Sequence, residues 1–254
     1  MNTIPAQDDP LAAELAGLAA PAPAHFADSV FARWGEVDGP VGSLYVVFTD
    51  RGINYVRPTA WAGDRSRFLD DYRNRFGRPL RPATRAPGGL AGALRTGRAT
   101  GLDYDLRGVG EFDRAVLAKT LEIPRGEVRP YAWIAREIGH PGAVRAAGSA
   151  LGRNPVPILI PCHRVVRSDG ASGNYGLGPD MKVDLLHAER VNLDETRELG
   201  RRGVHYLASG TTGVFCYPSC THARRITPAH RVELATVARA LDAEYRPCRH
   251  CRPA

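Results

Sequence analysis

The feature that most constrains this chain is an apolar run, Ile158 to Val166, in which a cysteine and a histidine stand side by side. A run this apolar belongs at the edge of a hydrophobic core, so it holds the thiol of Cys162 there with a titratable ring, His163, beside it. A free thiol is a weak nucleophile until it loses its proton, at a pKa of about 8.5. A neighbouring imidazole can lower that pKa or accept the proton outright. The pair therefore indicates a nucleophile, and a cysteine that merely fills the core is the alternative.

The residues around this pair make the first interpretation specific. The stretch 154–166 reads Asn-Pro-Val-Pro-Ile-Leu-Ile-Pro-Cys-His-Arg-Val-Val, and Asn174-Tyr-Gly176 and the segment 182–189 follow it. Over most of residues 40–195 the chain resembles the O6-alkylguanine-DNA alkyltransferases. The resemblance implies stoichiometric transfer of a methyl or alkyl group to Cys162 from O6-alkylguanine in DNA, and also from O4-alkylthymine, after the base has been flipped out of the duplex.

The resemblance also implies a role for each part of the reaction. Cys162 is the acceptor, His163 takes its proton through a water, and Glu189 holds the imidazole in the right tautomer. Tyr131 serves the flipped nucleotide and the protonation of the leaving base. From the sequence alone, Glu189 would pass for a solvated surface residue, because a carboxylate late in a helix meets the negative end of the helix dipole.

Further residues are implied to hold the DNA and the active-site turn. Arg145 matches the finger that replaces the extruded base, and Asn154 braces the turn before the active-site run. Arg164 is expected to contribute structure or a phosphate contact. The guanine pocket is expected to be lined by Pro157, Val165, Asn174, Tyr175 and Gly176.

Two positions depart from the family pattern. Gly176 stands where many relatives carry a serine or another side chain near O6, and Leu177 stands where glycine is frequent. A backbone N–H can replace the lost donor, and the added isobutyl group narrows or reshapes the pocket. We expect transfer to survive these changes, while the range of alkyl sizes stays open.

The charge of the chain is compatible with double-stranded DNA as the partner. The formal net charge is +7, and 32 arginines stand against 2 lysines, a skew that GC-rich codon usage explains equally well. Between Pro124 and Arg167 there are seven arginines and two glutamates. A surface that neutralises several phosphates gains affinity by counterion release. We therefore count the charge as support for nucleic acid, not as proof.

The N-terminal part predicts a small α/β unit. A β-hairpin is expected over 41–56, and a helix is expected from its cap at Asp64 to its end at Gly77. Residues 78–101 read as a loop with at most a short strand, and the alternation in 102–106 predicts a further strand. Residues before about 35 read as a loose leader, to which no chemistry is assigned.

The middle of the chain predicts helices. They are expected at 112–121, 131–138, 143–151 and 180–191, the last capped by Asp180. The second and third are short and meet across a tight turn that contains glycine, which fits a helix-turn-helix. An ordinary αα-hairpin is the alternative.

The four remaining cysteines form two close pairs, Cys216-x3-Cys220 and Cys248-x2-Cys251, separated by 27 residues. Two such pairs in a chain kept in a reducing compartment favour a tetrahedral zinc site, with two disulfides as the alternative. A segment of about 50 residues has little core of its own and needs such a cross-link. Strands are expected at 203–208 and 214–215, and a helix is expected after a cap at Thr227.

The sequence 211–220 and the sequence 246–253 resemble the metal-binding domain of the Ada DNA-repair protein. In that protein the first cysteine of the set accepts methyl groups from phosphotriesters while it remains a zinc ligand, and Cys216 is the matching residue. The helical part that begins the domain in Ada is not evident before Gly203. Triester repair by Cys216 and a purely structural zinc module that grips DNA therefore remain two open alternatives.

The expected fold class is α/β plus α, in four segments. By resemblance, the first folded domain is ribonuclease-H-like and the second is a winged helix-turn-helix-like catalytic and DNA-binding domain. The third is a small α+β domain with one structural Zn²⁺ on four cysteines. The expected segments are the leader 1–35, the supporting domain 36–107, the catalytic domain 108–200 and the zinc domain 203–254.

Two other classes of protein fit the sequence less well. A non-catalytic lesion-binding protein lacks the acceptor cysteine, which is present here, and an alkylation-sensing regulator needs an effector segment that we do not find. No organic cofactor is expected. A cytoplasmic monomer without membrane contact is expected, because no apolar run approaches the roughly 20 residues that span a bilayer.

Overall fold

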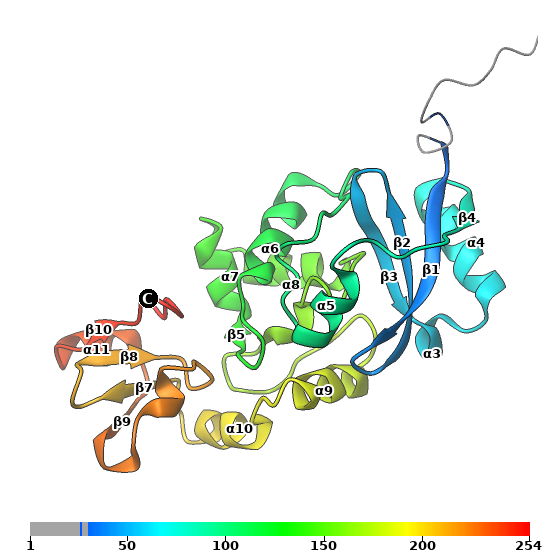
Figure 1. Ribbon diagram of the computed structural model, residues 1–254. Helices are drawn as coiled ribbons and strands as arrows, with labels where there is room; N and C mark the ends of the chain where they lie inside the picture. The colour runs from blue at the N-terminus through cyan, green and yellow to red at the C-terminus, as the bar shows by residue number, and fades with distance from the viewer. Residues whose placement is uncertain (1–25, 27–29) are drawn as a thin grey trace, which may run out of the picture.

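The computed structural model describes residue 26 and residues 30–254 (Figure 1). Most of the predicted leader lies outside the described residues. Its predicted end is wrong, because a strand of eight residues begins at Ala32. Among the described residues, none of the helices combines the length and the apolar content needed to cross a bilayer.

The N-terminal unit is a four-stranded sheet covered by short helices. Its strands are β1 (Ala32–Gly39), β2 (Gly42–Thr49), β3 (Gly52–Pro58) and β4 (Leu80–Pro82), in the order β3-β2-β1-β4. Its helices are α3 (Thr59–Ala62), α4 (Arg65–Phe76) and α5 (Leu90–Thr96). The β2–β3 hairpin and helix α4 confirm the predictions, and α4 has the predicted ends: the Asp64 side chain accepts from the backbone N–H of Arg67, and Gly77 is left-handed.

Two sequence predictions in this unit are wrong. Residues 102–106 form one isolated bridge, Tyr104 to Ile53, and no strand. The chain there runs so close to Gly52 that a Cβ on that glycine would lie 2.3 Å from the carbonyl oxygen of Asp103. Helix α5 lies in a segment that is predicted to be a loop. The prediction failed because the glycine and alanine residues of that segment give it the composition of a loop.

The middle unit is helical, as predicted. It contains α6 (Glu111–Leu121), β5 (Arg129–Pro130), α7 (Tyr131–Glu137), α8 (Val144–Gly152), the 3-10 turn η1 (Cys162–Arg164), β6 (Val165–Val166) and α9 (Pro179–Ala188). The two short strands β5 and β6 pair in parallel. Helix α9 differs from the prediction at both ends, because its N-cap is Gly178, not Asp180, and Glu189 is its C-cap.

The C-terminal unit is a second four-stranded sheet with short helical turns. It contains α10 (Leu193–Arg201), β7 (Tyr206–Ser209), β8 (Val214–Cys216), η2 (Ala223–Arg225), η3 (Pro228–His230), β9 (Arg231–Leu234), α11 (Val237–Asp242) and β10 (Arg246–Pro247). The strand order is β10-β8-β7-β9. The helix predicted from Thr227 is wrong: that residue opens one 3-10 turn, strand β9 follows, and the helix starts after Thr236, whose side chain accepts from the backbone N–H of Arg239.

One hydrophobic cluster runs through all three units. It joins one face of the N-terminal sheet, the middle helices around Cys162 and the four C-terminal cysteines. The other face of that sheet packs its aromatic residues on α4 as a separate cluster. Figure 1 shows the helical unit between the N-terminal sheet and the C-terminal unit. The continuous core therefore fixes Cys162 between two flanking structures.

Candidate active site and metal centre

The loop between α8 and η1 presents Cys162. Asn154 braces it: its Oδ1 accepts from the backbone N–H of Val156 at 2.9 Å, and its Nδ2 donates to the Ile160 carbonyl at 2.9 Å. The same Nδ2 lies 3.1 Å from the Cys162 sulfur. Within this loop Ile158 has a φ of 74°, a left-handed conformation that is costly for a β-branched residue. The asparagine thus holds both a strained turn and the thiol.

His163, the residue after Cys162, forms a buried hydrogen-bonded pair with Glu189. His163 Nε2 lies 3.0 Å from Glu189 Oε1, and the ring is 1% exposed. Among the described residues, Nδ1 of His163 has no hydrogen-bond partner. The sequence placed the carboxylate late in α9, and the structure brings it to the imidazole from the helix C-cap.

Arg164 completes this buried group. Its Nε and Nη2 donate to the two carboxylate oxygens of Glu189 at 2.9 and 2.7 Å. Its remaining donors reach the carbonyls of Ile123, at 2.6 Å, and Gly97, at 3.0 Å. The side chain is buried and these contacts are internal, which favours the structural alternative for Arg164 over a phosphate contact.

These contacts fix the charges of the resting site. Burial opposes ionisation of Glu189, but hydrogen bonds from His163 and Arg164 lower its pKa to about 2. Burial lowers the pKa of His163 in spite of the carboxylate, so the imidazole is neutral near pH 7. Burial raises the pKa of Cys162 against the Asn154 hydrogen bond and the charge of Lys182. Of the two possibilities open from the sequence, a lowered thiol pKa is therefore disfavoured, and proton transfer to the imidazole remains.

Lys182 is a site residue to which the sequence reasoning gave no role. It is fully buried on α9, and its Nζ donates to the Val165 carbonyl at 2.6 Å and to the Asn174 carbonyl at 3.4 Å. Burial lowers its pKa to about 8. A signal was available, because Lys182 lies four residues before Leu186 and so shares the buried face of its helix.

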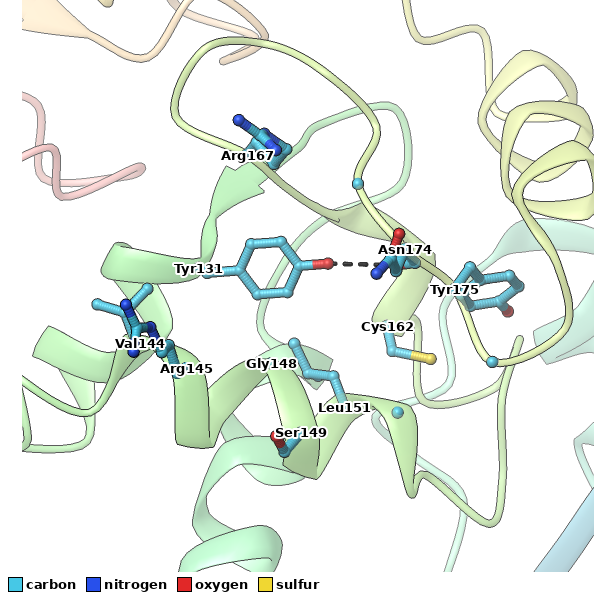
Figure 2. Close-up of a pocket in the computed structure, with 13 residues that line it drawn as sticks. Tyr131, Val144, Arg145, Gly148, Ser149, Leu151, Cys162, Arg167, Asn174 and Tyr175 are labelled. Carbon is cyan, nitrogen blue, oxygen red and sulfur yellow. Dashed lines mark hydrogen bonds between the residues drawn. The ribbon is translucent and has the colours of Figure 1, made fainter.

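A cavity of about 590 Å³ opens in front of the sulfur (Figure 2). Helix α8 forms one wall, with Arg145 at the exposed end, and Tyr131 and the 173–176 loop form the other. The Tyr131 hydroxyl donates to the Asn174 carbonyl at 3.4 Å. The predicted residues that share this cavity are Tyr131, Arg145, Cys162, Asn174, Tyr175 and Gly176.

A second cavity of about 30 Å³ also borders Cys162. Gly176 and Leu177 line it with Pro157, so both departures from the family pattern sit beside the sulfur. Arg57 and Trp61, from the N-terminal unit, also line it, and no sequence argument placed them there. Val165 lines neither of these cavities. It is fully buried, and its carbonyl accepts the hydrogen bond from Lys182.

The four C-terminal cysteines come together as predicted. Their sulfur atoms all lie within 4.8 Å of one another, and all four residues are buried and free of disulfides. The backbone N–H of Tyr217 lies 3.4 Å from the Cys251 sulfur, a contact that favours a thiolate there. Four soft sulfur donors in one cluster fit tetrahedral zinc. A cavity of about 400 Å³ next to the cluster is lined by Cys216 and Arg225.

Comparisons with known proteins agree with this geometry. Residues 111–191 match the family model of the 6-O-methylguanine DNA methyltransferase DNA-binding domain, and residues 194–254 match the metal-binding domain of Ada. The second match takes in α10, so the helical start that was not evident before Gly203 is present.

Named relatives point the same way. A methylated-DNA–protein-cysteine methyltransferase of Methanosarcina barkeri is 33% identical over 62% of this chain and 96% of its own length. One of Mycolicibacterium paratuberculosis is 48% identical over 39% of this chain, and the match spans 61% of that relative. The crystal structure of Mycobacterium tuberculosis OGT in complex with DNA aligns with a TM-score of 0.51 and 32% identity, covering 65% of this chain and 98% of that one.

A buried cysteine, imidazole and carboxylate beside a helix-lined cavity define a cysteine-acceptor transferase. The chain belongs to the methylated-DNA–protein-cysteine methyltransferase family.

Proposed function

We propose that this protein repairs DNA by direct, stoichiometric transfer of a methyl or alkyl group from O6-alkylguanine, and from O4-alkylthymine, to Cys162. The observation that carries the proposal is the hydrogen-bonded pair His163–Glu189 next to an acceptor sulfur that opens on a cavity walled by α8. Family membership and the relative solved with DNA support the same conclusion.

The residues account for each bond that changes. His163 takes the Cys162 proton through Nδ1, directly or through a water, because Nε2 is already held by Glu189. The sulfur attacks the alkyl carbon, the S–C bond forms and the C–O6 bond breaks. The electron pair stays on O6, which meets a proton donor, and Tyr131 serves as that donor. Burial raises the pKa of Tyr131, so its hydroxyl holds its proton until the leaving oxygen needs it.

The charges favour reaction in one direction. The proton moves onto an imidazole whose neighbouring carboxylate, with its pKa near 2, remains ionised throughout. The product thioether has no proton to regain and is a poor leaving group, so the acceptor is consumed once. The expected stoichiometry is one alkyl group per Cys162.

The same geometry gives the mode of DNA binding. Helix α8 presents Arg145 at the open end of the cavity, where the side chain can occupy the space of a base rotated toward Cys162. Helices α7 and α8 act as a helix-turn-helix in the catalytic domain 108–200, and the unit 36–107 supports it. The target is duplex DNA with an alkylated base, bound by a monomer.

A second activity is favoured by the cavity beside Cys216. One zinc ion on the four cysteines would keep their sulfurs ionised, and Arg225 at the same cavity would hold a phosphate there. Methyl transfer from a phosphotriester would make Cys216 a thioether and change the net charge of the zinc ion with its four sulfur ligands from −2 to −1. That change weakens repulsion of the DNA backbone.

One experiment separates these activities. The wild-type protein and Cys162→Ala are exposed to duplexes that carry labelled O6-methylguanine or a labelled methyl phosphotriester, and the adducts are located by mass spectrometry. We expect one methyl group on Cys162 with the first duplex and one on Cys216 with the second. Undiminished transfer from O6-methylguanine to Cys162→Ala would refute the acceptor assignment. The absence of an adduct on Cys216 would leave the zinc module structural.

The same assay tests the rival classes. A non-catalytic lesion-binding protein would bind the methylated duplex and leave it unchanged, and a regulator would show binding without stoichiometric repair. Retained lesion binding by Cys162→Ala is expected, because the cavity and Arg145 stay in place.

A further inference from the structure

A buried carboxylate, that of Glu127, joins the alkyltransferase to the zinc module. This residue is 1% exposed and lies on the segment that leads into β5. Its Oε1 accepts from the backbone N–H of Thr221 at 2.9 Å and lies 3.1 Å from Nε2 of His250. Its Oε2 accepts from Arg129 at 2.6 Å. Two of its three partners therefore belong to the zinc module.

Those two partners are neighbours of zinc ligands. Thr221 directly follows Cys220, and His250 directly precedes Cys251. A carboxylate oxygen of Glu127 lies within 4.8 Å of the Cys220 sulfur. Ser219, on the other side of Cys220, exchanges hydrogen bonds of 3.0 Å with the backbone N–H and carbonyl of Val128. Both metal-binding loops thus grip the same short segment.

The gripped segment continues directly into the active site. Arg129 and Pro130 form β5, which pairs with β6 at Val165–Val166, and Tyr131 follows β5 at once. Strand β6 in turn follows the 3-10 turn Cys162–Arg164 without a gap. A shift of Glu127 is therefore transmitted both to the tyrosine that faces the substrate cavity and to the turn that holds the acceptor.

The buried charge gives this contact its energetic weight. A carboxylate out of water is tolerated only when its hydrogen bonds are satisfied, and the loss of a partner is strongly unfavourable. Loops that carry zinc ligands generally lose their structure with the metal. If zinc leaves, Thr221 and His250 move away, and Arg129 remains as the single partner of a buried carboxylate.

We propose that Glu127 is a positioning residue that couples occupancy of the zinc site to the geometry of Tyr131 and of the Cys162 turn. The carboxylate rests in place only while both metal-binding loops are folded, so the zinc module is a working part of the acceptor site and not an independent appendage. By linkage the effect is reciprocal, and DNA held at the acceptor site strengthens retention of zinc. The activity readout rests on the proposed function, and the structural readout does not.

The test follows amide hydrogen exchange in the full chain, zinc-loaded and after chelation. In the wild type we expect chelation to speed exchange in 127–133 and 163–167 as well as in 203–254, while helix α4 keeps its protection. In Glu127→Gln we expect 127–133 and 163–167 to exchange quickly even with zinc bound and to respond no further to chelation. The matched control is Glu233→Gln, which removes the module's exposed ion pair with Arg202 and should respond like the wild type.

The second readout is the rate of methyl transfer from an O6-methylguanine duplex to Cys162. Chelation should slow the wild type roughly tenfold, a common size for coupling between sites, and should leave the rate of Glu127→Gln unchanged. Ser219→Ala removes the hydrogen bonds to Val128 without touching the buried charge, and it should show a smaller loss of the same kind. This variant keeps the test decisive if Glu127→Gln does not fold.

Two results would separate a failure of the coupling from a failure of the function. Faster exchange confined to 203–254 on chelation, with 127–133 unchanged in the wild type, would overturn the coupling whatever the transfer rates are. No methyl transfer by the zinc-loaded wild type would refute the proposed function, and the exchange pattern would still decide whether Glu127 couples the two sites.

Discussion

The molecule contains two buried cysteine sites with different chemical surroundings. Cys162 is 5% exposed and Cys216 is 1% exposed, and both line a cavity. At Cys162 an amide donor, Asn154, lies 3.1 Å from the sulfur, and the next residue in the chain is a neutral imidazole backed by a carboxylate. Around Cys216 the partners are three further thiols.

The difference teaches how a buried thiol becomes a nucleophile. Burial raises the pKa of Cys162, so under the proposed function its thiolate forms when the imidazole accepts the proton. A cysteine among zinc ligands loses its proton to metal binding, before any substrate arrives. Under the proposed function the first sulfur depends on a base and the second on a metal, and each dependence can be removed separately.

Removal of the metal should have the largest effect. Structural zinc sites contribute about 10 kcal/mol or more of binding free energy, so chelation should unfold the module 203–254 and abolish any adduct on Cys216. Circular dichroism and adduct mapping, with and without added Zn²⁺, check this. A module that keeps its fold and its triester chemistry after chelation would contradict the comparison.

Removal of the base comes next. His163→Gln should slow transfer to Cys162 by about 10²–10⁴-fold, the usual size of general-base catalysis. The same variant should leave an adduct on Cys216 unaffected, because that sulfur needs no proton acceptor. Single-turnover assays with the two labelled duplexes measure both rates. Equal losses of the transfer rate to Cys162 and to Cys216 would show that the two sulfurs do not differ in their need for a base.

Acid should destabilise the Cys162 site through its carboxylate. The folded pKa of Glu189, about 2, lies below its ordinary value of 4.5, so its stabilisation is complete above pH 4.5 and disappears as the pH falls toward 2. A shift of this size corresponds to about 3 kcal/mol. The lowered pKa of His163 acts in the same direction, since acid then charges a ring that the fold keeps neutral. Denaturant unfolding at pH 7, 5 and 3 should give a flatter profile for Glu189→Gln.

The matched control for this profile is Glu198→Gln, which removes an exposed carboxylate paired with Arg201. It should keep the wild-type pH profile. A wild-type profile in Glu189→Gln as well would mean that the buried carboxylate does not govern acid stability.

The smallest effect concerns the size of the alkyl group. Leu177→Gly enlarges the cavity of about 30 Å³ beside the sulfur, so transfer of bulky groups such as benzyl should accelerate about tenfold. Methyl transfer should stay nearly unchanged. Competition between the two substrates measures the ratio, and an unchanged ratio would remove Leu177 as a determinant of substrate size.

Elements with a local signal could be predicted from the sequence. The β2–β3 hairpin, helix α4 between Asp64 and Gly77, and the cysteine cluster all carry their own turn, cap or spacing pattern. The pair His163–Glu189 could be placed only by resemblance, because the two residues lie 26 positions apart in the sequence.

Features that depend on distant partners could not be predicted. Strand β1 begins within the sequence assigned to a leader, and it is defined by pairing with β2 and, in parallel, with β4. Arg164 is held in part by the Gly97 carbonyl of the N-terminal unit, and Glu127 by the Thr221 backbone N–H and the His250 ring of the C-terminal unit. Thr227-Pro228 has the residue types of a helix start. The chain instead forms a 3-10 turn and then the edge strand β9 of the second sheet, and Thr236 caps the helix that follows.

The left-handed Ile158 carries a consequence for the chain before it is finished. An isoleucine leaves that conformation as soon as its surroundings release it, so the turn exists only where Asn154 and the packed core are already in place. A partly folded chain therefore lacks the turn that holds the Asn154 amide against the Cys162 sulfur.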